Sequence, residues 1–506
     1  MLKGGIIVKK RLFLNEDSDN FGYFCHQENL LPDESLIDGF IDYYADSGVT
    51  DFVLNLNCAV STTESAVFDS FIAKYEKTEE FGAPVNYKDT FLRVYYHIAR
   101  VLGIDLYGRW IDRLKMHGIR PWLSFRMNDC HHNDFCYNEN NKPEWSTTAY
   151  RSPFAWFDIT LDYSQEPVRE AMFNYIKEQT ARYDVYGIEL DFDREPYCFP
   201  AGKKAQGRAI ITEFVAQVRA FLDELGKQRG HRIQLSLLCQ ANPIDAYENG
   251  FDIAAITRRH LVDLVVACPR WETINNDIPV GVWKQLIPDD VDFACKQELL
   301  VRSYPSYRAW HFPSVSTAHS LGQASAFESM GTDVTYLFNY MYKYFSTAKP
   351  SEEDAIRIVE GSAMSGEAYL PTLRLLADTD NYRTHPLRFP LTYNDFGNLY
   401  NKTAPRLPQT VEGERAQLMR IVTGRIDPDR RCYLIIETSE AIDPATLTVF
   451  ANGIRATYIP DGKEDRAVFK ERVYTFAFDC EIDDCVEFDL LATEPCTVEY
   501  MEVLAE

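Results

Sequence analysis

The sequence predicts an α/β fold: a (β/α)8 TIM barrel followed by a C-terminal antiparallel β-sandwich domain. Over the first two-thirds of the 506 residues, apolar runs that read as strands alternate with amphipathic helical stretches, as in a parallel sheet covered by helices. Polar side chains follow these strands, each time at the C-terminal end. After about residue 415 the pattern changes to short strands separated by turn residues.

Eight apolar runs supply the strands of the predicted barrel. They occupy residues 11–15, 51–57, 119–126, 185–191, 232–238, 262–267, 291–296 and 334–339. Helices are expected between them, for example from residue 32 to 44, 165 to 183 and 209 to 228, where apolar side chains recur every three or four residues. Two long insertions, residues 61–86 and 133–155, follow strand C-termini, where the loops of such barrels build the site.

Three domains are predicted. Residues 1–350 form the catalytic barrel, 351–405 a helical connector that packs on it, and 406–506 the small β-sandwich domain. Turn signals such as Asn452-Gly453 separate the strands of the sandwich. These strands are expected at residues 417–422, 432–436, 446–450, 473–478, 486–491 and 497–503.

Composition and cysteine spacing limit the possible binding partners and the cellular compartment of the protein. A formal net charge of −24 argues against nucleic acid or an anionic membrane as a partner. The N-terminal apolar run is too short for a secretory signal, so we expect a cytoplasmic protein, or a secreted one if a signal had been removed. The 12 cysteines are scattered without CxxC pairs, which indicates reduced thiols rather than a disulfide framework or a metal site.

The third predicted strand ends in an unusual group of polar residues. Residues 126–132 read Arg-Met-Asn-Asp-Cys-His-His, so a guanidinium, an amide, a carboxylate and two imidazoles come together after an apolar strand. Packing requires none of them, and loops on a rigid sheet are where ligands are held. The alternative is a polar loop with two solvated histidines. We favour a site, because the other strand ends are polar too.

The fourth predicted strand carries closely spaced carboxylates. Alternation would place Glu189, Asp191 and Asp193 on one side if the strand stays regular. Glycoside hydrolysis needs such an arrangement, with an acid for the leaving oxygen and a base or nucleophile at the anomeric carbon. The alternative is a strand end in which these carboxylates form ion pairs with Arg194.

His131 has two competing interpretations. As an acid/base, its ordinary pKa of about 6.5 suits neutral pH, and Asp129 could orient the ring. A metal site formed by His131, His132, Asp134 and Asp191 is the alternative. We expect neither a metal nor a cofactor, because the HxH and HExxH spacings are absent.

Two arginines indicate the class of substrate. Arg126 and Arg194 end neighbouring strands, so their guanidiniums could converge. Arginine holds a carboxylate better than any other side chain, and a neutral sugar would not need such a pair.

At these positions the chain resembles the glycoside hydrolase family 156 exo-sialidases and the related glycosidase-like barrels around them. The resemblance covers the barrel and the tail, and it rests on Asn15-Glu16-Asp17, Arg126-Met127-Asn128-Asp129 with His131, Gly187-Ile188-Glu189-Leu190-Asp191-Phe192 followed by Arg194, and Asn339. It implies metal-independent, inverting hydrolysis of terminal α-linked sialic acid, often by a dimer. The chain departs from the family where it reads Asn-Glu-Asp-Ser instead of Asn-Asp-Asp-Gly from residue 15.

The resemblance also implies a role for each matching residue. His131 would be the catalytic imidazole beside Asp129, and the N-terminal acidic residue would fall on Glu16 or Asp17. Arg126 and Arg194 would hold the sugar carboxylate, and Asn339 would contact the substrate.

Together these observations predict an exo-acting glycoside hydrolase for a carboxylated sugar, most of all sialic acid. Alternatives are a glycosidase for a uronic acid or a neutral sugar, a metal-dependent hydrolase, and a carbohydrate-binding barrel without catalysis. The expected partner is a glycan or sialoside substrate, and a homodimer is a candidate assembly. The expected catalytic residues are His131, Asp129, Asp17 and Asp191, and the expected substrate-binding residues are Arg126, Asn128, Asp193, Arg194, Glu195 and Asn339.

Overall fold

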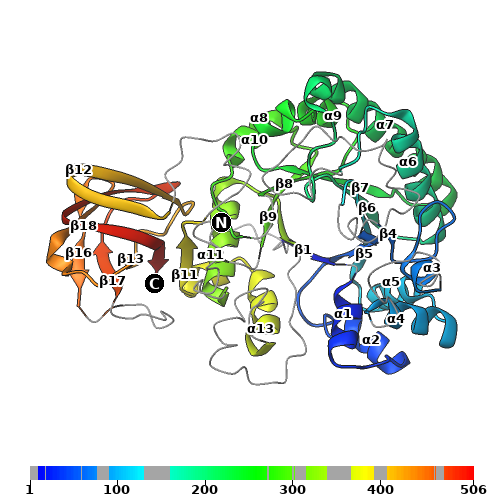
Figure 1. Ribbon diagram of the computed structural model, residues 1–506, viewed down its shortest axis with the longest axis horizontal. Coiled ribbons are helices and arrows are strands. Elements are labelled where there is room, and N and C mark those ends of the chain that lie inside the picture. Colours follow the sequence, from blue (N-terminus) through cyan, green and yellow to red (C-terminus); the bar gives the residue numbers. More distant parts are fainter. Residues whose placement is uncertain are drawn as a thin grey trace, which may run out of the picture. The chain divides into compact units, whose positions relative to one another are not determined.

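The structure is a computed structural model that confirms the predicted (β/α)8 barrel with a C-terminal β-domain (Figure 1). It describes residues 10–17, 19–58, 60–76, 90–129, 160–269, 273–298, 301, 315–338, 366–392, 407–460, 462 and 472–506.

All eight predicted barrel strands are present, with ends shifted by one or two residues. They are β1 (Arg11–Glu16), β2 (Asp51–Asn55), β5 (Arg120–Arg126), β6 (Gly187–Asp191), β7 (Gln234–Gln240), β8 (Leu264–Cys268), β9 (Asp292–Gln297) and β10 (Val334–Phe338). They close in the order β1-β10-β9-β8-β7-β6-β5-β2. The pairings from β1 through β2, β5, β6 and β7 to β8 are parallel, so the C-terminal ends of these strands lie at one end of the barrel.

Helices and short strands fill the connections, and the three helices expected from apolar spacing correspond to α2, α6 and α7. In the described part of the chain, no helix is both long and apolar enough to span a membrane. The elements are α1 (Asn20–Gln27), α2 (Glu34–Asp42), β3 (Asn57–Cys58), β4 (Val60–Ser61), α3 (Phe71–Glu76), α4 (Leu92–Tyr96), the π-helix η2 (His97–Val101), α5 (Leu106–Met116), α6 (Glu166–Arg182), the 3-10 helix η5 (Ala201–Lys203), α7 (Lys204–Arg229), α8 (Pro243–Glu248), α9 (Ile253–Arg258), α10 (Val280–Leu286) and α11 (Thr317–Met330).

The chain divides into two compact units. The barrel unit comprises Leu12–Cys268 and Val282–Ala294, and the C-terminal unit comprises Met1–Arg11, Pro269–Gly281 and Cys295–Glu506. The predicted boundaries at residues 350 and 405 lie outside the described residues.

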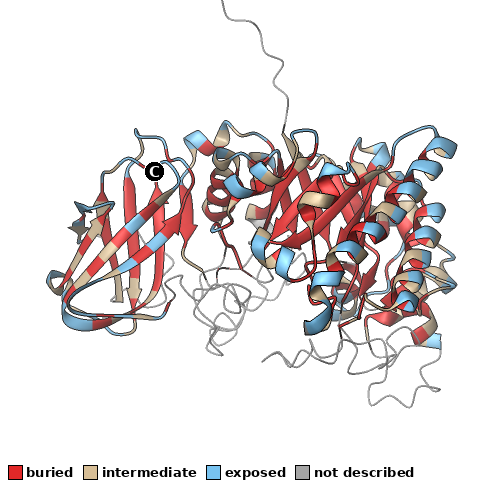
Figure 2. Cartoon of the chain, turned by 90° about the horizontal axis from the view of Figure 1, so that it is seen from above, coloured by how far each residue is buried: buried red, intermediate tan, exposed pale blue. Residues whose placement is uncertain are grey.

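A buried carboxylate lies inside the barrel unit. Glu189 is fully buried and accepts hydrogen bonds from Asn15 Nδ2 (3.1 Å), Ser124 Oγ (2.9 Å) and Ser236 Oγ (3.4 Å). These four side chains come from β1, β5, β6 and β7, so they share the barrel interior, and Figure 2 shows these strands buried over most of their length. Because side chains alternate along a strand, Arg126 and Asp191 face the same interior one pleat nearer the C-terminal end.

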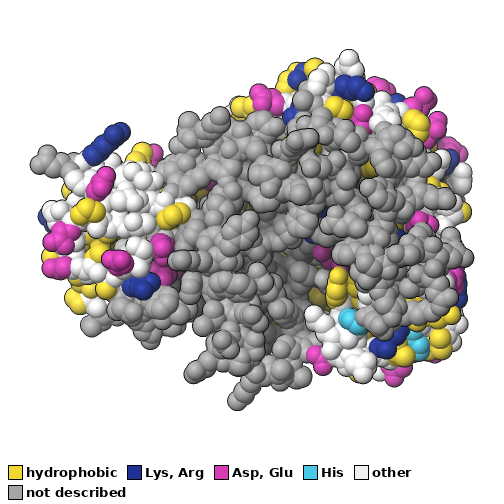
Figure 3. Space-filling view, viewed as in Figure 1, with side chains coloured by type: hydrophobic (Ala, Val, Ile, Leu, Met, Phe, Trp, Pro, Cys, Tyr) yellow, Lys and Arg dark blue, Asp and Glu magenta, His cyan; other side chains and the backbone are white. Residues whose placement is uncertain are grey.

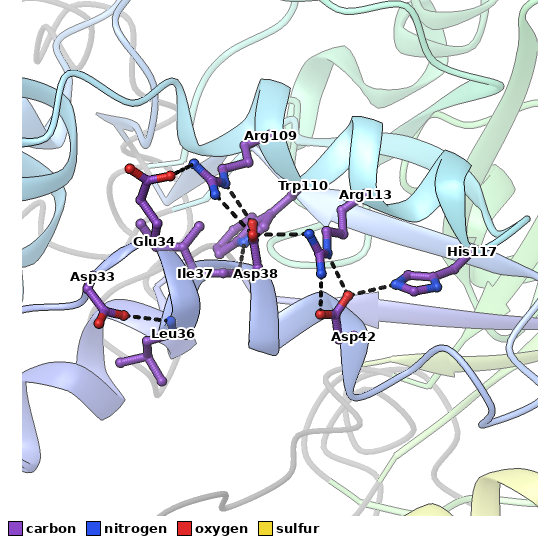
Figure 4. Close-up of polar contacts among 10 residues, drawn as sticks. All are labelled: Asp33, Glu34, Leu36, Ile37, Asp38, Asp42, Arg109, Trp110, Arg113 and His117. Carbon is purple, nitrogen blue, oxygen red and sulfur yellow. Dashed lines mark hydrogen bonds and ion pairs between the residues drawn. The ribbon is translucent and has the colours of Figure 1, made fainter.

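A network of ion pairs joins α2 to α5 on the outside of the barrel unit (Figure 4). Arg109 binds both oxygens of Asp38 (2.6 and 2.9 Å), and Arg113 binds both oxygens of Asp42 (2.6 and 2.5 Å). Arg113 also contacts Asp38 (3.0 Å), so one network links both pairs. The hydrogen bond from Arg109 lowers the pKa of Asp38. The helices are therefore held together by charge as well as by their apolar faces.

The C-terminal unit contains the antiparallel β-domain. Its sheet runs β15-β14-β18-β13-β17-β16, and β11 and β12 also pair with β18. One of its strands, β11, lies within the segment predicted to be a helical connector. The elements are α13 (Gly366–Leu376), α14 (Asn381–Thr384), β11 (Leu387–Pro390), β12 (Gln409–Val422), β13 (Cys432–Thr438), the 3-10 helix η7 (Pro444–Thr446), β14 (Leu447–Ala451), β15 (Ile454–Arg455), β16 (Thr457–Ile459), β17 (Val473–Phe478) and β18 (Cys485–Ala505).

The two last predicted strands of this domain are one continuous strand, β18. The two strands were expected at residues 486–491 and 497–503, and Pro495, which cannot donate a hydrogen bond to a neighbouring strand, lies between them. The partner strand β12 is irregular at this point: its register shifts between Val411 and Gly413 and again between Gly413 and Gln417. Proline is tolerated opposite such irregularities, so β18 continues through it.

Helix α11 packs closely against this sheet within the C-terminal unit. His319 Nε2 lies 3.0 Å from Glu502 Oε2, and both side chains are fully buried. Arg388 pairs with the other oxygen of Glu502, and Tyr500 donates to Oε2 (2.7 Å). A Cβ atom on Gly322 would overlap the backbone oxygen of Arg388, so glycine permits the close approach of α11 to β11.

Replacing Asp38 with Asn tests the α2–α5 network. Because the pKa of Asp38 is lowered in the folded protein, its stabilising effect is present above the unfolded pKa of about 3.9 and disappears as the pH falls through the folded value. We expect D38N to lower the free energy of unfolding by about 1 kcal/mol or less at neutral pH. Chemical denaturation of both proteins from pH 7 downward measures this. If the difference in free energy of unfolding between wild type and D38N stayed the same in acid, the ion pairs of Asp38 would not be its source.

Replacing Gly322 with Ala tests the approach of α11 to β11. The added methyl group would push the helix from the sheet, and overpacking of this kind costs about 1–3 kcal/mol. The matched control is Gly39→Ala in α2, where a Cβ atom has open space and should stabilise the helix by roughly 0.5–1 kcal/mol. Thermal melts of the two variants should therefore shift in opposite directions.

Candidate active site

The C-terminal ends of β1, β5 and β6 bring together six charged residues, which we call the strand-end cluster. Arg126 and Asp191 are the last residues of β5 and β6 and are register partners. Asp17 directly follows β1. The members of the cluster, all in the barrel unit, are Asp17, Arg126, Asp129, Asp191, Arg194 and Glu195.

Arg126 is the centre of the cluster. Its side chain is 1% exposed; Nη1 donates to Asp129 Oδ2 (2.9 Å), and Nη2 pairs with Asp17. Its backbone N–H donates to Asn57 Oδ1 (3.0 Å), and its carbonyl accepts from Asn57 Nδ2 (2.8 Å). Side chain and backbone are thus both fixed. Only its place just after β2 could have pointed to this role of Asn57 from the sequence.

The two arginines predicted to converge lie within electrostatic reach of each other. Burial lowers the pKa of Arg126, and the positive charge of Arg194 lowers it further. Burial also disfavours the charged form of Arg194, but the carboxylates of Glu195 and Asp129 outweigh it, so the pKa of Arg194 is raised. Both guanidiniums therefore lie in the same field of buried carboxylates. Their convergence on one ligand stays a prediction.

The turn after β6 differs from the predicted alternation. Asp191 Oδ1 accepts hydrogen bonds from the backbone N–H groups of Asp193 (2.9 Å) and Arg194 (3.2 Å), so the strand ends at Asp191. Asp193 belongs to this turn rather than to the pleated face of the strand. Glu189 is separated from the cluster as well, because Asn15, Ser124 and Ser236 hold it deeper in the barrel. Alternation thus puts Glu189 and Asp191 on one face of β6, with Glu189 deeper in the barrel, and only the expected placement of Asp193 on that face was wrong.

Asn128 holds the chain around the cluster. Its Nδ2 donates to the carbonyl oxygens of Glu195 (2.8 Å) and Tyr197 (3.3 Å), and its Oδ1 accepts from the backbone N–H of Leu161 (2.6 Å). This amide thus positions the loop that carries Arg194. Its direct contact with a substrate stays a prediction.

The remaining predicted site residues are either buried near the cluster or lie outside the described residues. Asp193 and Glu195 are buried, with 1% and 3% exposure. His131 and Asn339 lie outside the described residues. Of the alternative metal set, His131, His132 and Asp134 lie outside them too, and within the described ranges no group of three His, Cys, Asp or Glu side chains is placed to hold an ion.

Charged side chains on the outer surface are mixed in sign. On the face seen in Figure 3, acidic and basic side chains of the described residues are interspersed.

Comparison with known proteins finds only distant structural similarity. No protein-family model matches the chain, and none of the curated proteins matches it in sequence. Among solved structures it is similar to a chitinase from Paenibacillus sp. str. FPU-7 (TM-score 0.38, 10% identity, 97% of this chain and 52% of that chain). It is also similar to the galactosidase domain of an alpha-galactosidase-sucrose kinase, with a TM-score of 0.35, 12% identity, and coverage of 96% of this chain and 55% of that chain.

A third similar structure is the glycoside hydrolase domain of PgaB from Bordetella bronchiseptica, with a TM-score of 0.41, 13% identity, and coverage of 70% of this chain and 99% of that domain. The chain spans about half the length of the first two proteins. At these identities and scores the likeness carries no argument about chemistry, so a functional assignment must rest on the site.

Glu16 lies beside Asp17 but has different surroundings. It is 5% exposed, and Asn20 Nδ2 donates to its Oε1 (2.9 Å). Burial raises the pKa of Glu16 to about 8, with the hydrogen bond from Asn20 opposing and the charge of Asp19 adding to the effect. Glu16 is therefore mainly protonated at neutral pH, and it is Asp17 that contacts Arg126.

Replacing Glu16 with Gln tests its protonation. The folded pKa lies above the unfolded value of about 4.3, so wild-type stability is greatest below that value and falls as the pH rises through about 8. Gln keeps the hydrogen bond from Asn20 and cannot ionise. We expect equal stability near pH 4 and an advantage for E16Q on the order of a few kcal/mol at pH 9. Denaturation curves of both proteins between pH 4 and pH 9 measure this difference in stability. If the stabilities of wild type and E16Q changed with pH in parallel, Glu16 would not be protonated at neutral pH.

Proposed function

We propose that this protein is an exo-acting glycoside hydrolase that removes a terminal carboxylated sugar, with sialic acid as the first candidate. The observation that carries the proposal is the pair Arg126 and Arg194, both buried and both within reach of the same carboxylates. Two neighbouring guanidiniums suit a carboxylate attached to the anomeric carbon. Nε of Arg126 is buried and has no hydrogen-bond partner among the described residues, so this donor remains for a ligand.

The carboxylates of the strand-end cluster suit the chemistry of this reaction. Asp17, Asp129, Asp191 and Glu195 outnumber the two arginines, and a surplus of negative charge favours an oxocarbenium-like transition state. In this proposal His131 acts as the acid/base, and Asp17, Asp129 and Asp191 are the candidate carboxylates that assist it. Hydrolysis would be metal-independent and inverting, with water attacking the face opposite the leaving group.

A glycosidase for a neutral sugar is the second candidate, and one observation favours it. Arg126 already pairs with Asp17 and Asp129, so a substrate carboxylate would have to compete with two carboxylates of the chain itself. A neutral sugar would meet the same acid groups without this competition. The carboxylate of a uronic acid would compete with Asp17 and Asp129 for Arg126, as that of sialic acid would.

A fluorogenic sialoside tests the leading proposal. Arg194→Gln should reduce kcat/KM roughly 10- to 100-fold, mainly through KM, because a charge-assisted hydrogen bond is lost. His131→Ala should reduce kcat by about 10²- to 10⁴-fold if this imidazole transfers a proton. The matched control is Arg120→Gln: Arg120 lies on β5 like Arg126 but at its other end, where it pairs with Asp51 (2.5 Å). This control should retain activity.

The outcomes separate the alternatives. Sialoside cleavage that survives both Arg194→Gln and His131→Ala would overturn the assigned site. Cleavage of an aryl glucuronide or a neutral aryl glycoside alone would establish the second candidate. Sugar binding without turnover of any glycoside would indicate a carbohydrate-binding barrel, and activity lost with a chelator and restored by a metal would indicate a metal-dependent hydrolase.

A further inference from the structure

Gln240 is the last residue of β7 and faces the inside of the barrel. Ser236, four residues earlier, contacts Glu189 in the barrel interior (3.4 Å), and alternation places Leu238 and Gln240 on the same face. Leu238 is the register partner of Asp191. Gln240 therefore lies one pleat nearer the C-terminal end than Leu238, next to the strand-end cluster. The sequence marked it only as one polar residue at a strand end.

The amide of Gln240 is buried and has no hydrogen-bond partner among the described residues. The side chain is 2% exposed, and neither Oε1 nor Nε2 has a partner in the described part of the chain. Buried polar groups are nearly always hydrogen-bonded, so two such atoms on one amide require an explanation. The contrast is Gln179 of α6, which is fully buried too, accepts from Thr63 Oγ1 (2.9 Å) and donates to the carbonyl of Glu64 (3.3 Å).

The backbone around Gln240 is held in place by its neighbours. The carbonyl of Ala241 accepts from Trp283 Nε1 (2.7 Å), and Asn242 caps α8 by accepting from the backbone N–H of Ile244 (2.9 Å). Cys268 of β8 is the register partner of Gln240 itself. The amide is thus presented from a fixed strand end, as a specific binding group requires.

We propose that Gln240 binds a vicinal pair of hydroxyl groups on the substrate sugar. One hydroxyl donates to Oε1 while its neighbour accepts from Nε2, so a single ligand feature satisfies both buried atoms. The inference rests on the proposed function, because it takes the ligand to be a sugar, and it deepens that function by assigning the uncharged part of the substrate. In sialic acid the vicinal hydroxyls belong to the glycerol side chain, so Gln240 is a specificity residue for that chain.

The first part of the test measures stability without ligand. Gln240→Met keeps the size of the side chain and removes two unpartnered polar atoms, so the melting temperature should stay the same or rise. The matched control Gln179→Met breaks hydrogen bonds that the chain itself makes and should lower the melting temperature by roughly 2–4 °C or more. If Gln240→Met is destabilised as much as Gln179→Met, Gln240 is a structural residue and the proposal is overturned.

The second part measures recognition of the glycerol side chain. Wild type and Gln240→Met are compared on a fluorogenic sialoside and on the same sialoside shortened by periodate oxidation and borohydride reduction. We expect Gln240→Met to lose roughly 10- to 100-fold in kcat/KM on the intact substrate and to match wild type on the shortened one. An equal loss on both substrates would overturn the assignment.

A third measurement separates this proposal from the proposed function. If wild type cleaves no sialoside, the sialidase assignment fails, and thermal shift with glucuronic acid, galactose and N-acetylneuraminic acid then decides about Gln240. A sugar that raises the melting temperature of wild type but not of Gln240→Met supports the proposal. Shifts that are equal in both proteins, or absent in wild type with all three sugars, overturn it.

Discussion

The ion pairs of Arg126 with Asp17 and Asp129 are the interaction on which the organisation of the strand-end cluster depends. A buried guanidinium is costly unless it is paired, and these two carboxylates would be equally costly without it. The pairs therefore require the segments after β1 and β5 to lie together. Asn57 adds the segment after β2 through the backbone of Arg126. One residue, through its side chain and its backbone, thus fixes three connections that lie far apart in the sequence.

The polar layer below this cluster constrains the barrel in a second way. Glu189 takes hydrogen bonds from Asn15, Ser124 and Ser236, and each lies on a different strand. A slip of one residue in any strand would turn its polar side chain out of the interior and leave Glu189 short of a donor. Apolar residues alone would tolerate such a slip more easily. The layer therefore specifies the register that brings Arg126 beside Asp191.

Periodicity sufficed to predict the eight barrel strands, because each is a short apolar run bounded by polar residues and needs no knowledge of its neighbours. It failed at Pro495, where the irregular partner strand decides the outcome, and at β11, whose pairing with β18 spans more than a hundred residues. In the site, too, local pattern predicted some features, while others depend on contacts between distant parts of the chain. Strand-end position predicted that Arg126 and Arg194 could converge, and the charge of Arg194 does lower the pKa of Arg126. Three features of the site depend on tertiary contacts, which no local pattern contains. Asp129 binds Arg126, Asn128 holds a loop, and Gln240 is buried with no partner in the part of the chain that the structure describes.

The contact of His319 with Glu502 has a consequence for how the molecule folds. These residues are 183 positions apart in the chain, yet both are fully buried and joined to Arg388 and Tyr500. Loop-closure entropy must be overcome before so distant a contact forms, and chains rich in such contacts fold slowly. Helix α11, between two barrel strands in sequence, thus gains its full stabilisation only when β18 arrives. The β-domain is accordingly a folding partner for this helix.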